Sequence, residues 1–123
     1  MNVGIGYVVL YMNDTKQAAK FWTETFGFEI KKTVKVGTKQ VITVGASNSQ
    51  TNFELVPLSL MSDNPYNLNL GIPSICLHVD NLQQEHARLT KLGANVSEIN
   101  DMAGIESMSI IDLEGNAFAI IQR

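Results

Sequence analysis

The apolar residues of this chain change their spacing in an order that predicts strand, helix and then further strands. Residues 7–12 (YVVLYM) form a short run rich in β-branched and aromatic side chains, which predicts a buried strand. An amphipathic helix ending at Gly27 is predicted next, from apolar residues that recur at helical spacing: Ala18, Ala19, Trp22 and Phe26. Three more apolar runs predict strands at residues 28–36, 40–46 and 52–56.

The same order returns after a connector, residues 57–70, which contains prolines and asparagines and has no clear period. Residues 74–79 (SICLHV) predict a strand, and a helix is expected over residues 82–92, ending at Gly93. Further strands are predicted near residues 95–99, 106–111 and 117–122, with a hairpin at residues 112–116 between the last two.

The two halves also agree in register. Residues 7–12 align with residues 74–79, and residues 53–56 align with residues 118–121, when one residue is removed in each of two places. Duplication is the plainest explanation. We therefore predict an α+β fold of two tandem βαβββ modules within a single domain that spans residues 1–123. The first module covers about residues 1–56 and the second about residues 71–123, and the helices are expected to start near residues 13–15 and near Asn81.

Composition narrows the class of protein. Of the 123 residues, 45% are hydrophobic and 17% charged, the balance of a globular protein, and a net charge of −3 offers no basic face for nucleic acid. A single cysteine, Cys76, excludes an internal disulfide and is typical of a reducing cytoplasm. No signal peptide or membrane-spanning apolar stretch is visible, so we expect no membrane association and a cytoplasmic location.

Several short motifs, taken in order, resemble the vicinal oxygen chelate superfamily, which includes glyoxalases, bleomycin-resistance proteins and dioxygenases. In the first module they are residues 7–14 (YVVLYMND), 21–22 (FW) and 26–28 (FGF). In the second they are residues 71–80 (GIPSICLHVD), 92–94 (LGA) and 112–116 (DLEGN). The resemblance implies that the two modules form a curved, half-open mixed sheet around a pocket. Because such a sheet leaves apolar surface open, a homodimer is also predicted.

The resemblance also implies where a metal would bind. Metal-dependent members of the superfamily take one ligand from the first and one from the last strand of each module, and those positions are here Tyr7, Glu54, Ser74 and Ala119. Only Glu54 matches the usual ligand set of His and Glu. A phenol, a hydroxyl and a methyl group do not complete a site for a divalent ion, so we predict no metal and no cofactor.

Alternation along the strands extends the candidate site, because residues i, i+2 and i+4 share a face. Tyr11 is expected beside Tyr7, and His78 beside Ser74. The predicted ligand-binding set is therefore Tyr7, Tyr11, Glu54, Ser74, His78 and Ala119.

Individual side chains leave alternatives open. Glu54 interrupts an apolar run, so it needs a partner. It is an inherited ligand position hydrogen-bonded to Tyr7 or Ser74, a working acid or base, or the acceptor of a cationic ligand. His78 is expected in the pocket wall or at a dimer face, the alternative being a metal held by Glu54, His78 and waters. Cys76 is interpreted as a buried thiol of the core or of the pocket wall, and His86 as a solvated surface residue.

These observations favour a protein that binds an organic small molecule without turnover, as the resemblance to bleomycin-resistance proteins implies. The alternative is a metal-dependent glyoxalase, lyase or dioxygenase, or an enzyme that uses Glu54 as a base. A third possibility is a subunit-interaction module that binds no ligand.

Overall fold

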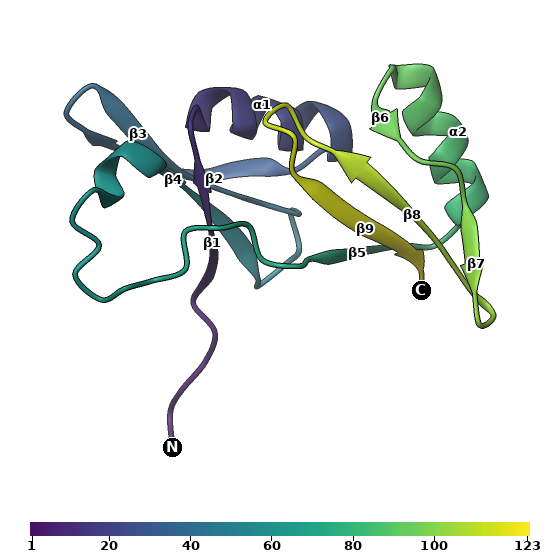
Figure 1. Cartoon of the computed structure of the whole chain (residues 1–123), viewed down its shortest axis with the longest axis horizontal. Helices are drawn as coiled ribbons and strands as arrows, with labels where there is room; N and C mark the ends of the chain where they lie inside the picture. The colour runs from purple at the N-terminus through teal and green to yellow at the C-terminus, as the bar shows by residue number, and fades with distance from the viewer. The chain divides into compact units, whose positions relative to one another are not determined.

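The computed structural model describes residues 1–101 and 103–123 in full. The chain forms two compact units, residues 1–72 and residues 73–123 (Figure 1). Each unit is a sheet with one long helix packed against one of its faces.

The first unit contains four strands and two helices. In chain order they are β1 (Tyr7–Met12), α1 (Thr15–Phe26), β2 (Glu29–Val36), β3 (Lys39–Gly45), β4 (Asn52–Pro57) and the 3₁₀ helix η1 (Leu58–Met61). The strands lie in the order β1-β4-β3-β2, with β1 parallel to β4 and the other pairs antiparallel.

The second unit repeats this plan. Its elements are β5 (Cys76–Val79), α2 (Leu82–Leu92), β6 (Asn95–Val96), β7 (Asn100–Met102), β8 (Ile105–Ile111) and β9 (Ala117–Gln122). Their order is β5-β9-β8-β6, with β7 also paired to β8 and β5 parallel to β9. In both units the first strand lies next to the last, the last next to the penultimate, and the penultimate next to the second, which confirms the predicted α+β topology.

Both long helices have the same kinds of N-terminal and C-terminal cap. The Asp14 carboxylate accepts a hydrogen bond from the Gln17 amide at 3.0 Å, and the Asn81 side chain accepts one from the Gln84 amide, also at 3.0 Å. Each helix ends at a glycine, Gly27 or Gly93, in the left-handed conformation that glycine adopts without steric penalty. The predicted helix bounds are confirmed.

An aromatic cluster packs α1 onto its sheet. Trp22 is fully buried, with its ring 4.9 Å from that of Phe53 on β4 and 5.4 Å from that of Phe28. Phe21 and Phe26 extend the cluster along the helix. Burial of aromatic rings contributes much of the core energy of a small domain, so this cluster fixes which face of the sheet the helix covers.

The core of the second unit is mostly aliphatic, with one buried aromatic ring, Phe118, among the described residues. Leu82 and Leu89 of α2 are buried, as are Phe118 and Ile120 on β9. The helix also carries an ion pair in which Arg88 Nε lies 2.7 Å from Glu85 Oε1, and the hydrogen bonds to that carboxylate raise the pKa of Arg88.

Some boundaries differ from the prediction. β5 begins at Cys76 rather than at Ser74. Pro73 has no amide hydrogen to donate, and Ser74 lies outside the hydrogen-bonded pairing of β5 with β9. The Ile75 carbonyl oxygen still accepts a hydrogen bond from the Ala119 amide at 3.1 Å. The strand expected near residues 95–99 is two short strands, β6 and β7, that both pair with β8. The connector contains the short helix η1. Among the described residues, no helix is long and apolar enough to cross a membrane.

Candidate functional site

The sheet of the first unit has one face packed on α1 and one open face. Leu10, Phe53 and Leu55 point to the helix side and are buried. Since side chains alternate along a strand, the open face carries Tyr7, Val9 and Tyr11 from β1, with Asn52, Glu54 and Val56 opposite them on β4. The structure thus places the predicted residues Tyr7, Tyr11 and Glu54 on one face of one sheet.

Strand register arranges this open face in rows that cross the sheet. In the middle row, Val9 pairs with Glu54, Glu54 with Thr43, and Thr43 with Lys32. The two central residues of this row, Glu54 and Thr43, are polar. The next row is apolar and consists of Tyr11, Val56, Val41 and Val34, since Tyr11 pairs with Val56 and Val34 with Val41. A carboxylate and a hydroxyl therefore lie beside a strip of valines.

The polar groups of the middle row have no partners within the protein. Glu54 is half-buried and makes no hydrogen bond or ion pair to another residue of the first unit. Thr43 is only 6% exposed, and its hydroxyl likewise makes no hydrogen bond to the described side chains or backbone. The hydrogen bond between Tyr7 and Glu54, one of the alternatives for this carboxylate, does not form within the described part of the first unit.

Asn52, in the row beyond Glu54, has a different environment. Its Oδ1 is the one fully buried side-chain polar atom without a hydrogen-bond partner among the residues that the structure describes. A Cβ atom added at Gly45 would collide with that oxygen, so the missing side chain at Gly45 provides the space for the Asn52 amide. Thr43 Oγ1 is not among the fully buried atoms, so it retains some contact with solvent.

The second unit has the equivalent open face. Cys76 pairs with Ala119 and His78 with Ile121, so these four residues share one side of the sheet, while Phe118 and Ile120 face α2. His78 and Ala119 are exposed, and Ser74 is exposed two residues before β5. Tyr7, Tyr11 and Glu54 thus lie in the first unit and Ser74, His78 and Ala119 in the second. The convergence of the two sets on one cavity stays a prediction.

Two side chains differ from their predicted environments. Cys76 was expected to be a buried thiol of the core or of the pocket wall. Its side chain is exposed, because it lies on the open face of the edge strand β5. His86 was expected to be solvated, but it is half-buried, with Nε2 3.0 Å from the Ser97 carbonyl oxygen. It joins α2 to the segment after β6, which indicates a structural role.

The chemistry of the donor set does not fit the metal site of the metal-dependent relatives. The ligands would come from the first and last strands of each unit. Val9 on β1 lies opposite Glu54 on β4, and at the equivalent place in the second unit Cys76 on β5 lies opposite Ala119 on β9. Within the described residues, no group of three or more His, Cys, Asp or Glu side chains could hold a metal ion. A single half-buried carboxylate does not offset the cost of removing water from a divalent ion.

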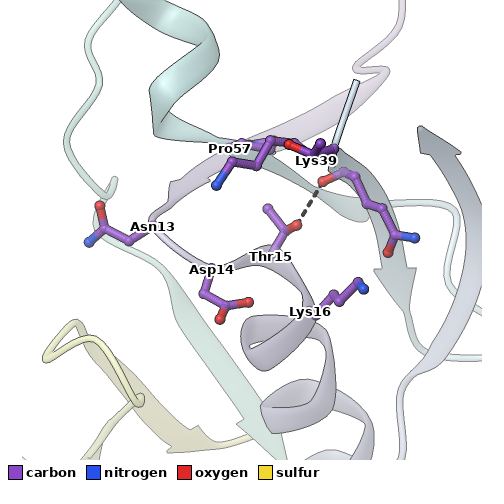
Figure 2. A pocket seen from close by; sticks show the side chains of 8 residues that line it. Asn13, Asp14, Thr15, Lys16, Lys39 and Pro57 are labelled. Carbon is purple, nitrogen blue, oxygen red and sulfur yellow. Dashed lines mark hydrogen bonds between the residues drawn. The ribbon is translucent and has the colours of Figure 1, made fainter. Parts of the chain in front are cut away.

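A depression of about 200 Å³ lies elsewhere on the first unit, at the N-terminal end of α1 beside the β2–β3 turn (Figure 2). Thr15 lies within it and donates a hydrogen bond from Oγ1 to the Gln40 carbonyl oxygen at 2.7 Å, which ties the helix to β3. Asp14, Lys16 and Lys39 line the rim (Figure 2). None of the predicted site residues lines this depression, so we assign it a structural role in joining helix and sheet.

Thr43 and Asn52 flank Glu54 on the open face and were not predicted from the sequence. Alternation within residues 40–46 places Thr43 on one face of its strand, but a sequence does not give the register between neighbouring strands. The Thr43–Glu54 pairing is set by the loop between β3 and β4, whose length fixes which residues lie opposite.

Comparison with known proteins agrees with this architecture. Residues 4–120 match the model of the Glyoxalase/Bleomycin resistance protein/Dioxygenase superfamily. The uncharacterized protein YurT of Bacillus subtilis is 27% identical over 120 residues, which is 93% of this chain and 94% of YurT.

Two solved structures show the same fold at low sequence identity. TnmS3, an antibiotic binding protein from Streptomyces sp. CB03234, is 18% identical with a TM-score of 0.78, covering 98% of this chain and 96% of TnmS3. Lactoylglutathione lyase from Agrobacterium tumefaciens is 20% identical with a TM-score of 0.73, covering 98% and 94%. Given the match over nearly its full length, the chain belongs to the Glyoxalase/Bleomycin resistance protein/Dioxygenase superfamily.

Proposed function

We propose that this protein binds an organic small molecule on the open sheet faces of its modules, without the catalytic metal of its enzymatic relatives. One observation carries the proposal: Glu54 is the only carboxylate or imidazole among the four superfamily ligand positions, and it lies beside accessible aromatic and aliphatic side chains. Binding sites for organic molecules are mostly apolar surfaces with a few fixed polar groups. The antibiotic binding protein TnmS3 has the same fold, which supports this class of function.

The second candidate is an enzyme of the superfamily. The retained Glu54 favours it, since a half-buried carboxylate without a protein partner is able to accept a proton from a bound substrate. The lactoylglutathione lyase fold shows that this scaffold also supports catalysis, and fold alone does not decide between the two functions.

Titration with metal ions separates metal-free binding from a metal-dependent enzyme. Calorimetry of the purified protein with Zn²⁺, Ni²⁺ and Mn²⁺ is expected to show no stoichiometric tight binding, because one carboxylate leaves most of the coordination sphere unfilled. Glu54→Gln is the test variant, and Glu24→Gln on the exposed side of α1 is a control for net charge.

Micromolar or tighter binding that disappears in Glu54→Gln and persists in Glu24→Gln would contradict the metal-free proposal. If His78→Ala also removed it, the metal would be held by Glu54 and His78 together.

A further inference from the structure

The open face of the first unit indicates the chemical class of the ligand, because its central polar groups are unsatisfied. We propose that the molecule bound there carries a protonated amine, received by Glu54 and Thr43, joined to a flat apolar body that lies along the adjacent valine row. This inference rests on the proposed function and specifies which organic molecules the face selects.

The Glu54 carboxylate requires a donor. When ionised it only accepts hydrogen bonds, and it is half-buried without a protein donor. Hydrogen bonds between an ammonium group and a carboxylate are roughly twice as strong as those between neutral groups. A ligand amine therefore satisfies Glu54 better than a ligand hydroxyl does.

Thr43 supplies a second, independent observation. It lies directly opposite Glu54 across the β3–β4 ladder, is 6% exposed, and has no hydrogen-bond partner among the described residues. Opposed side chains in a sheet have their Cβ atoms about 5 Å apart. An ammonium group seated between them can donate one N–H to the carboxylate and another to the hydroxyl oxygen, since it has three donors and no acceptor.

Lys32 is the positive charge nearest to this point in the row, and it does not neutralise Glu54. It lies beyond Thr43, two strand spacings or about 10 Å from Glu54 between Cα atoms. Lys32 is exposed and forms no ion pair with Glu54. Because Lys32 forms no ion pair with it, the Glu54 carboxylate is left to receive a cation from a ligand.

The surroundings of Glu54 suit an apolar body attached to the amine. Val34, Val41, Val56 and Tyr11 form the neighbouring row, and Val34 is 41% exposed. Tyr7 and Tyr11 lie on β1 diagonal to Glu54, within reach for long aromatic side chains, and Tyr7 is 50% exposed. Their ring faces are able to attract the same cation, which adds to the preference for an amine.

Three probes with one ring system test the charge preference directly: 2-naphthylmethylamine, 2-naphthylmethanol and 2-naphthylacetate. We expect calorimetry to show the amine binding about tenfold more tightly than the alcohol, with the acetate weakest. Amide shifts in ¹H–¹⁵N spectra are expected to concentrate in β3 and β4. Glu54→Gln is expected to make amine and alcohol bind equally, while Thr43→Val, a nearly isosteric change, weakens the amine two- to threefold.

Glu24→Gln on the exposed side of α1 changes the net charge equally and should preserve the tenfold preference. Equal binding of amine and alcohol to the wild type, with shifts in β3 and β4, would overturn the amine inference and leave organic binding intact. If none of the three probes bound at millimolar concentration, both the amine inference and the proposed binding of organic molecules would be overturned for this face. A preference that survives Glu54→Gln would also refute the inference.

Discussion

At the scale of single residues, Asp112 shows how one side chain specifies a turn. It is 7% exposed, and its Oδ1 accepts hydrogen bonds from the amides of Glu114 at 2.9 Å and Asn116 at 2.8 Å. Its Oδ2 accepts a third, from Asn116 Nδ2 at 3.1 Å. A buried carboxylate satisfied by three donors holds the β8–β9 connection in one conformation.

Asp112→Ala is therefore expected to lower the free energy of unfolding by about 1–3 kcal/mol, because three donors lose their acceptor in a partly buried turn. Asp112→Asn should cost less, since its amide oxygen still serves the backbone donors. Chemical denaturation measures both. Leu113→Ala is the control: this neighbour is 65% exposed and should change stability by less than about 0.5 kcal/mol. Equal losses in Asp112→Ala and Leu113→Ala would contradict the account.

Residue environments were only partly predictable from the sequence. The hairpin at residues 112–116 follows from turn chemistry that is local in the chain. The exposure of Cys76 does not, because it depends on β5 being an edge strand, and edge position is a property of the whole sheet. The Thr43–Glu54 pair was missed for a related reason, since cross-strand register depends on the loop between the strands.

At the scale of elements, the two long helices are built by matching caps. Asp14 and Asn81 each accept a hydrogen bond at 3.0 Å from the backbone amide of the residue three positions later. Gly27 and Gly93 end the helices, with φ angles of 69° and 84°. These signals are local, so the sequence predicted the helices well. The strand near residues 95–99 was predicted less well, because its division into β6 and β7 depends on pairing with β8.

Because the caps match, Asp14→Ala and Asn81→Ala should cost similar amounts, about 1 kcal/mol each in the free energy of unfolding. Thermal or urea denaturation followed by circular dichroism provides the measurement. Lys20→Ala, an exposed position within α1, serves as control and should lie within about 0.5 kcal/mol of the wild type. A loss confined to one of the two caps would show that the helices are not energetically equivalent.

At the scale of the whole molecule, both units repeat one strand order and leave one sheet face open. The repeated strand order was predictable because the register of residues 7–12 and 53–56 is repeated in residues 74–79 and 118–121. The paired strands confirm this alignment, with Val9–Glu54 in the first unit equivalent to Cys76–Ala119 in the second. Assembly into a homodimer and a cytoplasmic location stay predictions.

The central claim is that the open faces bind an organic molecule and that the metal positions of the superfamily bind no metal. Native mass spectrometry of protein purified from cells without chelator measures both properties on one sample. The account predicts a population that carries an organic adduct, lost on denaturation, with no stoichiometric metal adduct. A protein that carries one zinc, nickel or manganese ion per chain, and loses that ion in Glu54→Gln, would contradict it.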